Sequence, residues 1–351
     1  MKGPSIKNKL FFVISLSFGL ILIFSVSVFA DVVKKTKTEV TFKGFGTFSK
    51  IQTEKILPEK KLTNSESEFK GKGILGKTAG KMLLRSGQFG EIIDLSSKVI
   101  YSMDHKKKEY TENPLEKIAD EEFKEEAEKS EEEEEELEAE EREDNIKIIR
   151  SEFKVVETGE SKVINQFDSR KYIITWLTEW ENIQSGEKGT DRLETEVWTT
   201  PFSGEIKQYY EEEQKFFSNY MKEIGLDADS LQKQILGTQW FSLLSGMGRD
   251  SGKLSDESTG FSKEMKKIKG YPVVIDGRYY TVREGEEKEE ESNAVSVKGM
   301  LGKFAKKAVA KKTAPKTQNE PSLSYYIELM DYSSANLSPE EFQVPSDYKK
   351  K

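Results

Sequence analysis

The segment Gln88–Pro114 limits what this chain can fold into more than any other, because it predicts short strands separated by tight polar turns. Glu91–Leu95 is one apolar stretch, and the polar residues Ser96–Lys98 follow it as a turn. In the return stretch, Val99–Met103, alternate residues fall on one face at a period of two. A second polar turn leads to another extended piece, which Asn113-Pro114 closes. The segment predicts a β-hairpin with one buried face, and nothing in it resembles a reaction centre.

The same alternation predicts further strands, of which Lys171–Trp180 is the clearest. A turn rich in glycine separates it from Leu193–Thr199, so these two segments are expected to pair as antiparallel neighbours. Four more segments are predicted to be extended: Val32–Phe48, broken at Gly44 and Gly46; Asn145–Phe167, with a turn at Thr158–Glu160; Pro272–Val282, with a turn at Asp276-Gly277; and Leu323–Met330. The residues between Lys50 and Glu68 are mixed and polar and predict no clear element.

A longer segment with helical spacing appears later in the chain. Apolar residues recur three and four positions apart from Ile206 to Ile224, and Gly225 ends the pattern. Asp227 or Asp229 can cap a second helix, so a helical insertion is predicted over about residues 204–248. Many short strands with helices inserted late predict an α+β fold, in which a sandwich or barrel of strands is covered on one face by helices.

Composition excludes several kinds of site. The chain of 351 residues has a net charge of −8, which gives no case for nucleic-acid binding. It has no cysteine and one histidine, His105, so disulfides, thiolate metal sites and histidine-rich metal centres are excluded. The adjacent Asp104 and His105 point apart in a strand or turn, and His105 is expected to be an exposed turn residue. No catalytic residue, metal ligand or cofactor is predicted, and the chain is expected not to be an enzyme.

The N-terminus predicts export. Met1–Lys9 carries three lysines, Leu10–Phe29 is almost wholly apolar or small, and Ala30 precedes Asp31. This order is typical of a signal peptide (residues 1–30) that is cleaved after Ala30, which places the protein in the periplasm or outside the cell. The alternative is an uncleaved anchor, because the apolar run reaches about 20 residues, enough to span a bilayer. In either case residues 31–351 act outside the cytoplasm, and they are expected to form one β-rich domain.

The run from about residue 117 to 144 is strongly acidic. Blocks of like charge are usually solvated linkers, so we interpret it as a self-repelling insertion, either helical or disordered. The alternative is a segment that binds cations or a partner. A calcium loop is not expected, because such loops need spaced oxygen ligands and a glycine turn.

Two basic amphipathic stretches resemble each other: Lys72–Met82, KGILGKTAGKM, and Lys298–Ala308, KGMLGKFAKKA. They predict either two helices packed on the sheet or a pair of mobile lids, which could also lie on an anionic membrane surface. The residues on the apolar faces that we assign to the lid or membrane-surface role are Ile74, Leu75, Met82, Met300, Leu301 and Phe304.

The first stretch also matches a nucleotide motif, since Gly71–Thr78 reads GKGILGKT. A phosphate-binding loop follows a buried parallel strand, and the preceding residues TNSESEFK cannot form one. In the second stretch Phe304 stands where Thr78 stands in the first. No nucleotide binding is therefore expected.

Four segments together resemble the exported bacterial proteins grouped around the outer-membrane lipoprotein carriers LolA and LolB. They read IIDLSSKVIYSMDHKKKEYTENP, TEVWTTPFSGEIKQYY, IKGYPVV and SPEEFQVPSDYKK, and the resemblance extends over roughly Val32–Pro114 and Asn145–Lys349. It implies an incomplete antiparallel β-barrel, a curved sheet covered by inserted helices, whose apolar interior holds acyl chains or another lipophile. It implies no catalytic residue. The acidic insertion, the two basic stretches and the greater length depart from the carriers.

The leading hypothesis is thus a non-enzymatic exported protein that binds a lipophilic ligand, lipid or lipoprotein in a half-open barrel. The residues expected to line its apolar cavity are Tyr172, Ile174, Trp176, Trp180, Trp198, Tyr101 and Met103. Aromatic residues on a sheet also fit a filled core. The alternative is therefore an envelope sensor or protein-interaction module whose barrel holds no ligand.

We predict that the mature protein begins at Asp31, because the small residue Ala30 ends an apolar stretch of the kind that signal peptidases cleave. N-terminal sequencing of the exported protein measures this directly. An intact Met1 in the membrane fraction would support the uncleaved anchor instead.

Overall fold

The computed structural model describes residues 31–73, 76, 86–117, 146–226, 260–283 and 320–351. All of them belong to one unit, Asp31–Lys351. The predicted signal peptide, the acidic insertion, the second predicted helix and the lysine-rich stretch near residue 300 lie outside these residues, as does most of the stretch that begins at Lys72. None of the helices in the described part of the chain is long and apolar enough to cross a membrane.

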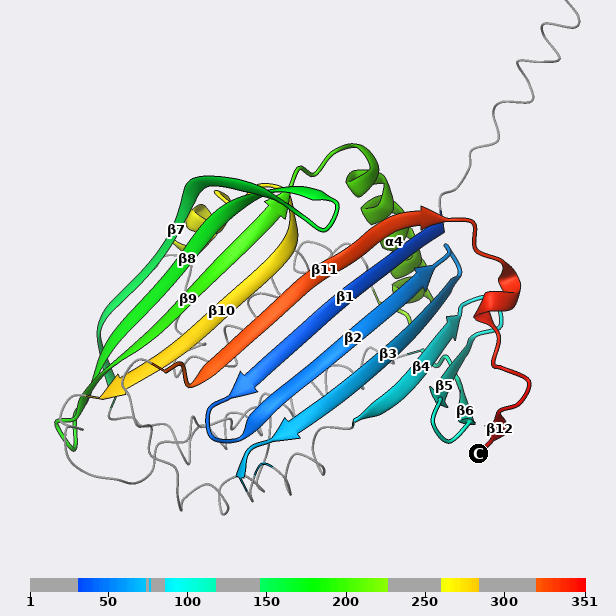
Figure 1. Cartoon of the computed structure of the whole chain (residues 1–351), viewed down its shortest axis with the longest axis horizontal. Coiled ribbons are helices and arrows are strands. Elements are labelled where there is room, and N and C mark those ends of the chain that lie inside the picture. The colour runs from blue at the N-terminus through cyan, green and yellow to red at the C-terminus, as the bar shows by residue number, and fades with distance from the viewer. Residues whose placement is uncertain (1–30, 74–75, 77–85, 118–145, 227–259, 284–319) are drawn as a thin grey trace, which may run out of the picture. The chain divides into compact units, whose positions relative to one another are not determined.

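The described residues form one large curved sheet of twelve strands with few helices (Figure 1). The strands are β1 (Asp31–Phe42), β2 (Gly46–Ile56), β3 (Lys60–Gly71), β4 (Gly87–Asp94), β5 (Val99–Asp104), β6 (Glu109–Pro114), β7 (Ile146–Ile164), β8 (Phe167–Asn182), β9 (Lys188–Thr200), β10 (Tyr271–Arg283), β11 (Leu323–Ala335) and β12 (Lys349–Lys350). Their order is β12-β6-β5-β4-β3-β2-β1-β11-β10-β9-β8-β7. Pairing is antiparallel throughout, except that β12 runs parallel to β6. Within the described residues the sheet is open, with β7 and β12 at its edges.

The pattern in Gln88–Pro114 is confirmed as the meander β4-β5-β6. The pairing of Lys171–Trp180 with Leu193–Thr199 is confirmed by β8 and β9, whose register places Tyr172 opposite Val197 and Trp176 opposite Leu193. Val32–Phe48 is a hairpin rather than one broken strand, since β1 and β2 pair on either side of a turn in which Gly44 has a φ of 76°. A positive φ is accessible to glycine without a steric cost.

Two predicted turns are wrong. Residues 158–160 lie inside β7, where the register shifts between Glu157 and Ser161, and the chain reverses only after Ile164. Asp276-Gly277 lies inside β10, where Gly277 pairs with Thr195 on one side and with Tyr325 on the other. In both segments the glycine serves a purpose other than a turn. Gly159 has a φ of 76° and lies in a bulge of β7, and Gly277 leaves room for the ring of Tyr325 on the neighbouring strand.

The polar residues between Lys50 and Glu68 also form strands, although the sequence predicts no clear element there. They complete β2 and make most of β3, which pairs with β2 and β4. Because β3 runs antiparallel to both neighbours, Gly71 does not follow the parallel strand that a phosphate loop requires. Gly76 has a packing role instead, because a Cβ there would lie 1.9 Å from the carbonyl oxygen of Phe45.

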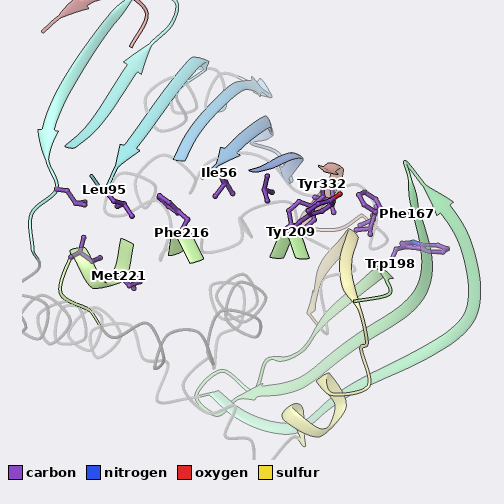
Figure 2. Close-up of a cluster of buried hydrophobic side chains, with 14 residues drawn as sticks. Ile56, Leu95, Phe167, Trp198, Tyr209, Phe216, Met221 and Tyr332 are labelled. Carbon is purple, nitrogen blue, oxygen red and sulfur yellow. The ribbon is translucent and has the colours of Figure 1, made fainter. Parts of the chain in front are cut away.

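Two helices lie against the same face of the sheet, which we call the inner face (Figure 2). The helix α4 (Gly204–Glu223) confirms the helical spacing after Ile206, and Gly225, with a φ of 84°, ends it as predicted. The short helix α7 (Phe261–Met265) packs on the strands near β7. The core under α4 includes Val32, Ile56, Leu95, Tyr209, Phe216, Met221, Leu329 and Tyr332.

The C-terminal segment covers part of the opposite, outer face. After β11 the chain makes the 3-10 helix η3 (Pro339–Phe342), and Phe342 is buried with Leu62, Ile92 and Met103 on strands β3 to β5. At the edge of this segment an exposed ion pair joins Lys108 to Asp347 at 2.6 Å. This cover removes an apolar patch of the outer face from water.

We predict that Gly277→Ala lowers the free energy of unfolding by about 1–3 kcal/mol, the usual cost of overpacking a core. The physical reason is that a Cβ at Gly277 would lie 2.1 Å from Cζ of Tyr325. Denaturant unfolding of the purified protein measures the effect. Asp276→Ala, at the next position and on the outer face, is the control and should leave stability nearly unchanged. Equal losses in the two variants would contradict the assigned role of Gly277.

Candidate ligand-binding site

The inner face of strands β7 to β11 is a continuous apolar surface. Antiparallel register brings side chains of the five strands into rows, because residues directly opposite each other share a face. The apolar residues of this surface are Phe153, Val155, Tyr172, Ile174, Trp176, Leu193, Val197, Ile275, Tyr279, Leu323 and Tyr325. They are the strongest candidates in the described residues for a surface that contacts a lipophilic ligand.

Trp176 lies at the centre of this surface, against apolar clusters on both sides of it. It is only partly buried, whereas its neighbour Ile174 is 1% exposed. Phe261 of α7 packs beside it, with its ring centroid 4.6 Å from that of Phe153. The helix is fastened there because the backbone N–H of Val155 donates a hydrogen bond of 2.8 Å to the Glu264 carboxylate.

Two hydrogen bonds lie within the apolar surface, and one of them joins Nε1 of Trp176 to Oγ of Ser151 at 3.3 Å. The hydroxyl oxygens of Thr195 and Tyr325 are 2.9 Å apart and share a hydrogen bond. Burial raises the pKa of Tyr325 to about 12, although the hydrogen bond with Thr195 acts in the opposite direction. The two hydroxyls satisfy each other, so this part of the surface needs no polar ligand group.

A mostly buried ion pair connects α4 to the sheet. The Nζ atom of Lys34 on β1 lies 2.8 Å from Oε1 of Glu213 on α4, and the two side chains are 17% and 20% exposed. The hydroxyl of Tyr332 on β11 donates a hydrogen bond of 2.9 Å to Oε2 of the same carboxylate. Two strands and one helix thus meet at one carboxylate. The ring of Tyr332 packs against those of Tyr209 and Tyr271, at centroid distances of 5.5 and 5.3 Å.

The pKa values in this cluster follow from that geometry. Burial acts to raise the pKa of Glu213, but the charge and hydrogen bonds of Lys34 and the Tyr332 hydroxyl more than offset it, so the pKa is lowered. Burial likewise opposes the charged form of Lys34, yet Glu213 raises its pKa overall. Burial and the nearby Glu213 charge raise the pKa of Tyr332. Lys34 and Glu213 are therefore both charged at neutral pH, and Tyr332 is a neutral donor.

The structure brings together three of the residues predicted to line the cavity and separates the others. Tyr172, Ile174 and Trp176 lie in one cluster on the inner face. Trp180 is on the same face, 1% exposed, and packs so closely over Gly189 that a Cβ there would lie 2.2 Å from its ring. Trp198 is next to Val197 in β9 and so points to the outer face, where Nζ of Lys162 lies 4.0 Å from its ring centroid.

Tyr101 and Met103 do not join the other predicted residues. They lie on the outer face with the C-terminal segment, where Met103 is 4% exposed and Tyr101 packs beside the cluster. Alternation places them correctly on one face of β5, but it does not say which face of the sheet that is. The predicted lid residues Ile74, Leu75, Met82, Met300, Leu301 and Phe304 lie outside the described residues.

His105 lies in a turn, as predicted, but it is not exposed. It is partly buried, and its two ring nitrogens lie 2.7 Å from the hydroxyl of Tyr348 and 2.9 Å from Oδ1 of Asn64. These contacts fasten the C-terminal segment to the outer face. Among the described residues no group of three or more acidic or histidine side chains is placed to hold a metal ion.

Sequence reasoning missed Lys34 and Glu213. A signal for Glu213 exists, because it lies four residues after Tyr209 and three before Phe216, and so falls within the apolar stripe of α4. A carboxylate inside such a stripe requires a partner. Nothing in the sequence of β1 distinguishes Lys34 from Lys35 or Lys37 as that partner.

Comparison of the chain with models of protein families, with curated proteins and with solved structures finds no match. The resemblance to the lipoprotein carriers therefore enters only the proposal below.

We predict that Glu213→Gln lowers the free energy of unfolding by about 3 kcal/mol, because it leaves the ammonium of Lys34 largely buried and uncompensated. The matched control is Glu223→Gln on the same helix, whose carboxylate pairs with Lys98 at 2.9 Å, with Lys98 60% exposed. Exposed ion pairs add little, so the control should unfold nearly like the wild type. Chemical denaturation compares them; similar losses in both would contradict a special role for Glu213.

The same pair predicts a dependence of stability on acid. The pKa of Glu213 is lowered by folding, so its stabilisation is complete above its ordinary value of 4.5 and is lost as the pH falls through the lowered pKa. The difference in unfolding free energy between wild type and Glu213→Gln should therefore shrink as the pH falls from about 5 to about 3. Thermal or denaturant unfolding over this range measures it, and a constant difference would contradict the ion-pair assignment.

Proposed function

We propose that the chain is a non-enzymatic exported protein that binds a lipophilic ligand on the inner face of β7 to β11. The observation that carries the proposal is the apolar surface that extends across five strands and is contacted by α7, a helix of five residues. A curved sheet with one apolar face and helices on it is also what an incomplete β-barrel of the lipoprotein-carrier kind would present. Figure 2 shows how the strands curve around the side on which α4 and α7 lie.

The ligand class follows from the surface itself. Its members are aliphatic and aromatic, and its central polar groups are hydrogen-bonded internally, Thr195 with Tyr325 and Nε1 of Trp176 with Ser151. Such a surface favours acyl chains or a similar lipophile over a polar metabolite. Trafficking of lipids or lipoproteins in the cell envelope, with peripheral contact to an anionic membrane, would use this property.

A second function is favoured by one observation. Tyr172, Ile174, Leu193 and Val197 are 1–2% exposed, so much of the inner face is already dry. A filled barrel of this kind would suit an envelope sensor or protein-interaction module that holds no ligand. The two proposals differ in whether an apolar molecule can enter beside Trp176.

We predict saturable binding of a neutral apolar probe, such as N-phenyl-1-naphthylamine, to the purified mature protein. Trp176→Ala should weaken that binding about tenfold, which corresponds to about 1.4 kcal/mol, because it removes the partly exposed ring at the centre of the surface. Leu177→Ala is the matched control, since Leu177 is also partly buried but faces the outer side of the same strand.

Probe fluorescence and its displacement by long-chain lipids give the readout, and the melting temperature of each variant shows that it is folded. The absence of saturable binding to the wild type would refute the ligand-binding proposal and support the filled barrel. Equal weakening in Trp176→Ala and Leu177→Ala would show that the probe does not bind at the inner face.

A further inference from the structure

The middle of the sheet carries a polar patch on its inner face. Strands β3, β2 and β1 lie at the centre of the strand order, next to β11. We call the following residues the inner polar patch: Thr36 and Thr38 on β1, Lys50 and Gln52 on β2, and Ser65 and Ser67 on β3. Central strands under a helical layer normally turn apolar side chains to that layer, so a polar patch there calls for a specific explanation.

The register shows that this patch belongs to the inner face. Thr36 lies opposite Leu329 and Thr38 opposite Ile327, and both β11 residues pack with inner-face clusters. Across the other strands, Lys50 lies opposite Thr38 and Ser67, and Gln52 lies opposite Thr36 and Ser65. The patch therefore directly borders the apolar surface that begins at β11.

Lys50 differs from the other lysines of this face. Lys34 is paired with Glu213, and Lys61 forms an ion pair with Glu54. Lys50 is partly buried, and no carboxylate of the described residues forms an ion pair with it. Its cross-strand neighbours carry hydroxyl groups, which can bind an anion's oxygen atoms but supply no charge.

The inner-face carboxylates of the neighbouring strands, Glu54 and Glu91, belong to another row, in which both lie opposite Thr63. Glu91 lies opposite Thr63 on β3 and Ser102 on β5, and Thr63 in turn lies opposite Glu54 rather than Lys50. Within the described residues the ammonium of Lys50 has no counter-charge, and an anion at this position would supply one.

We propose that Lys50 and the hydroxyl groups of the inner polar patch bind the anionic headgroup of an acidic lipid whose chain lies along the apolar surface toward Trp176. This inference rests on the proposed function and specifies its ligand. Five inter-strand spacings of about 4.8 Å separate β2 from β8, which gives about 24 Å along the sheet. Only a long-chain amphiphile can contact both Lys50 and Trp176.

The charge arrangement favours an anionic over a zwitterionic or neutral headgroup. The patch offers one ammonium and several hydroxyls, and it contains no carboxylate that could bind a cationic group. The ammonium and hydroxyl donors suit a carboxylate or phosphate oxygen, because charge-assisted hydrogen bonds to such atoms are the strong ones.

The test uses a matched pair of fluorescent ligands, cis-parinaric acid and its methyl ester, which share one chain and differ in the headgroup charge. Titrations at about pH 8 compare the mature wild type with Lys50→Gln, Lys50→Arg and Lys70→Gln. Lys70 is the control, because it is a lysine of β3 that is exposed and points to the outer face. We expect the wild type and Lys70→Gln to bind the acid at least about tenfold more tightly than the ester.

Lys50→Gln should remove that preference by weakening only the acid, and Lys50→Arg should keep it. Added salt should weaken the acid more than the ester. If Lys50→Gln does not fold, the comparison of the wild type with Lys50→Arg and the salt dependence still decides the question. Equal affinity of the wild type for acid and ester, or a preference for the acid that survives in Lys50→Gln, would overturn the headgroup proposal alone. Failure of both ligands to bind any variant would overturn the proposed function.

Discussion

Every side chain of this sheet belongs to one of two faces, and antiparallel register fixes that choice for twelve strands together. A slip of one residue in any strand would move a buried row into water and a charged row into the core. Three features hold the register in place: the bulges of β7, the glycine at position 277 under the ring of Tyr325, and the ion pair between Lys34 and Glu213. The location of every candidate binding residue depends on this register.

Different interactions stabilise the buried side chains in different parts of the inner face. Near β7 to β11 it is apolar, and burial itself stabilises it. Under α4 it contains two opposite charges that satisfy each other with the help of Tyr332. Removing either charge alone is costly, because the partner's desolvation remains. The ion pair and the hydrogen bond from Tyr332 therefore fix the position of α4 along β1 and β11. Apolar contacts alone would allow several positions, because they are not directional.

The sequence predicts strands wherever alternation is strict, as in β4 to β6, β8 and β9, because such patterns fit only one local structure. It fails where one residue type serves two purposes. Gly159 and Gly277 both predict a turn. In the structure Gly159 lies in a bulge, and Gly277 accommodates the ring of Tyr325 from the neighbouring strand. It also fails for β3, whose polar residues are stabilised by pairing on both sides and not by burial.

The candidate site could be predicted only within one strand. Tyr172, Ile174 and Trp176 share a face by local geometry, and the structure keeps them together. Tyr101 and Met103 share a face by the same rule, but the C-terminal segment covers that face, and no local pattern records a contact between residues more than two hundred positions apart. The partnership of Lys34 with Glu213, 179 residues apart, is missed for the same reason.

The distribution of polar groups on the inner face bears on what the surface can hold. On the apolar surface of β7 to β11, the hydroxyls of Thr195 and Tyr325 form a hydrogen bond with each other and need no polar group from a ligand. In the central strands, several hydroxyls and one lysine face the same side, and Lys50 forms no ion pair with any of the described residues. A purely apolar ligand would suit the first region and offer no negative charge to Lys50 in the second, whereas an acidic amphiphile suits both. The contrast between these two regions, rather than the apolar area alone, is the reason that an acidic lipid fits this face better than a hydrocarbon.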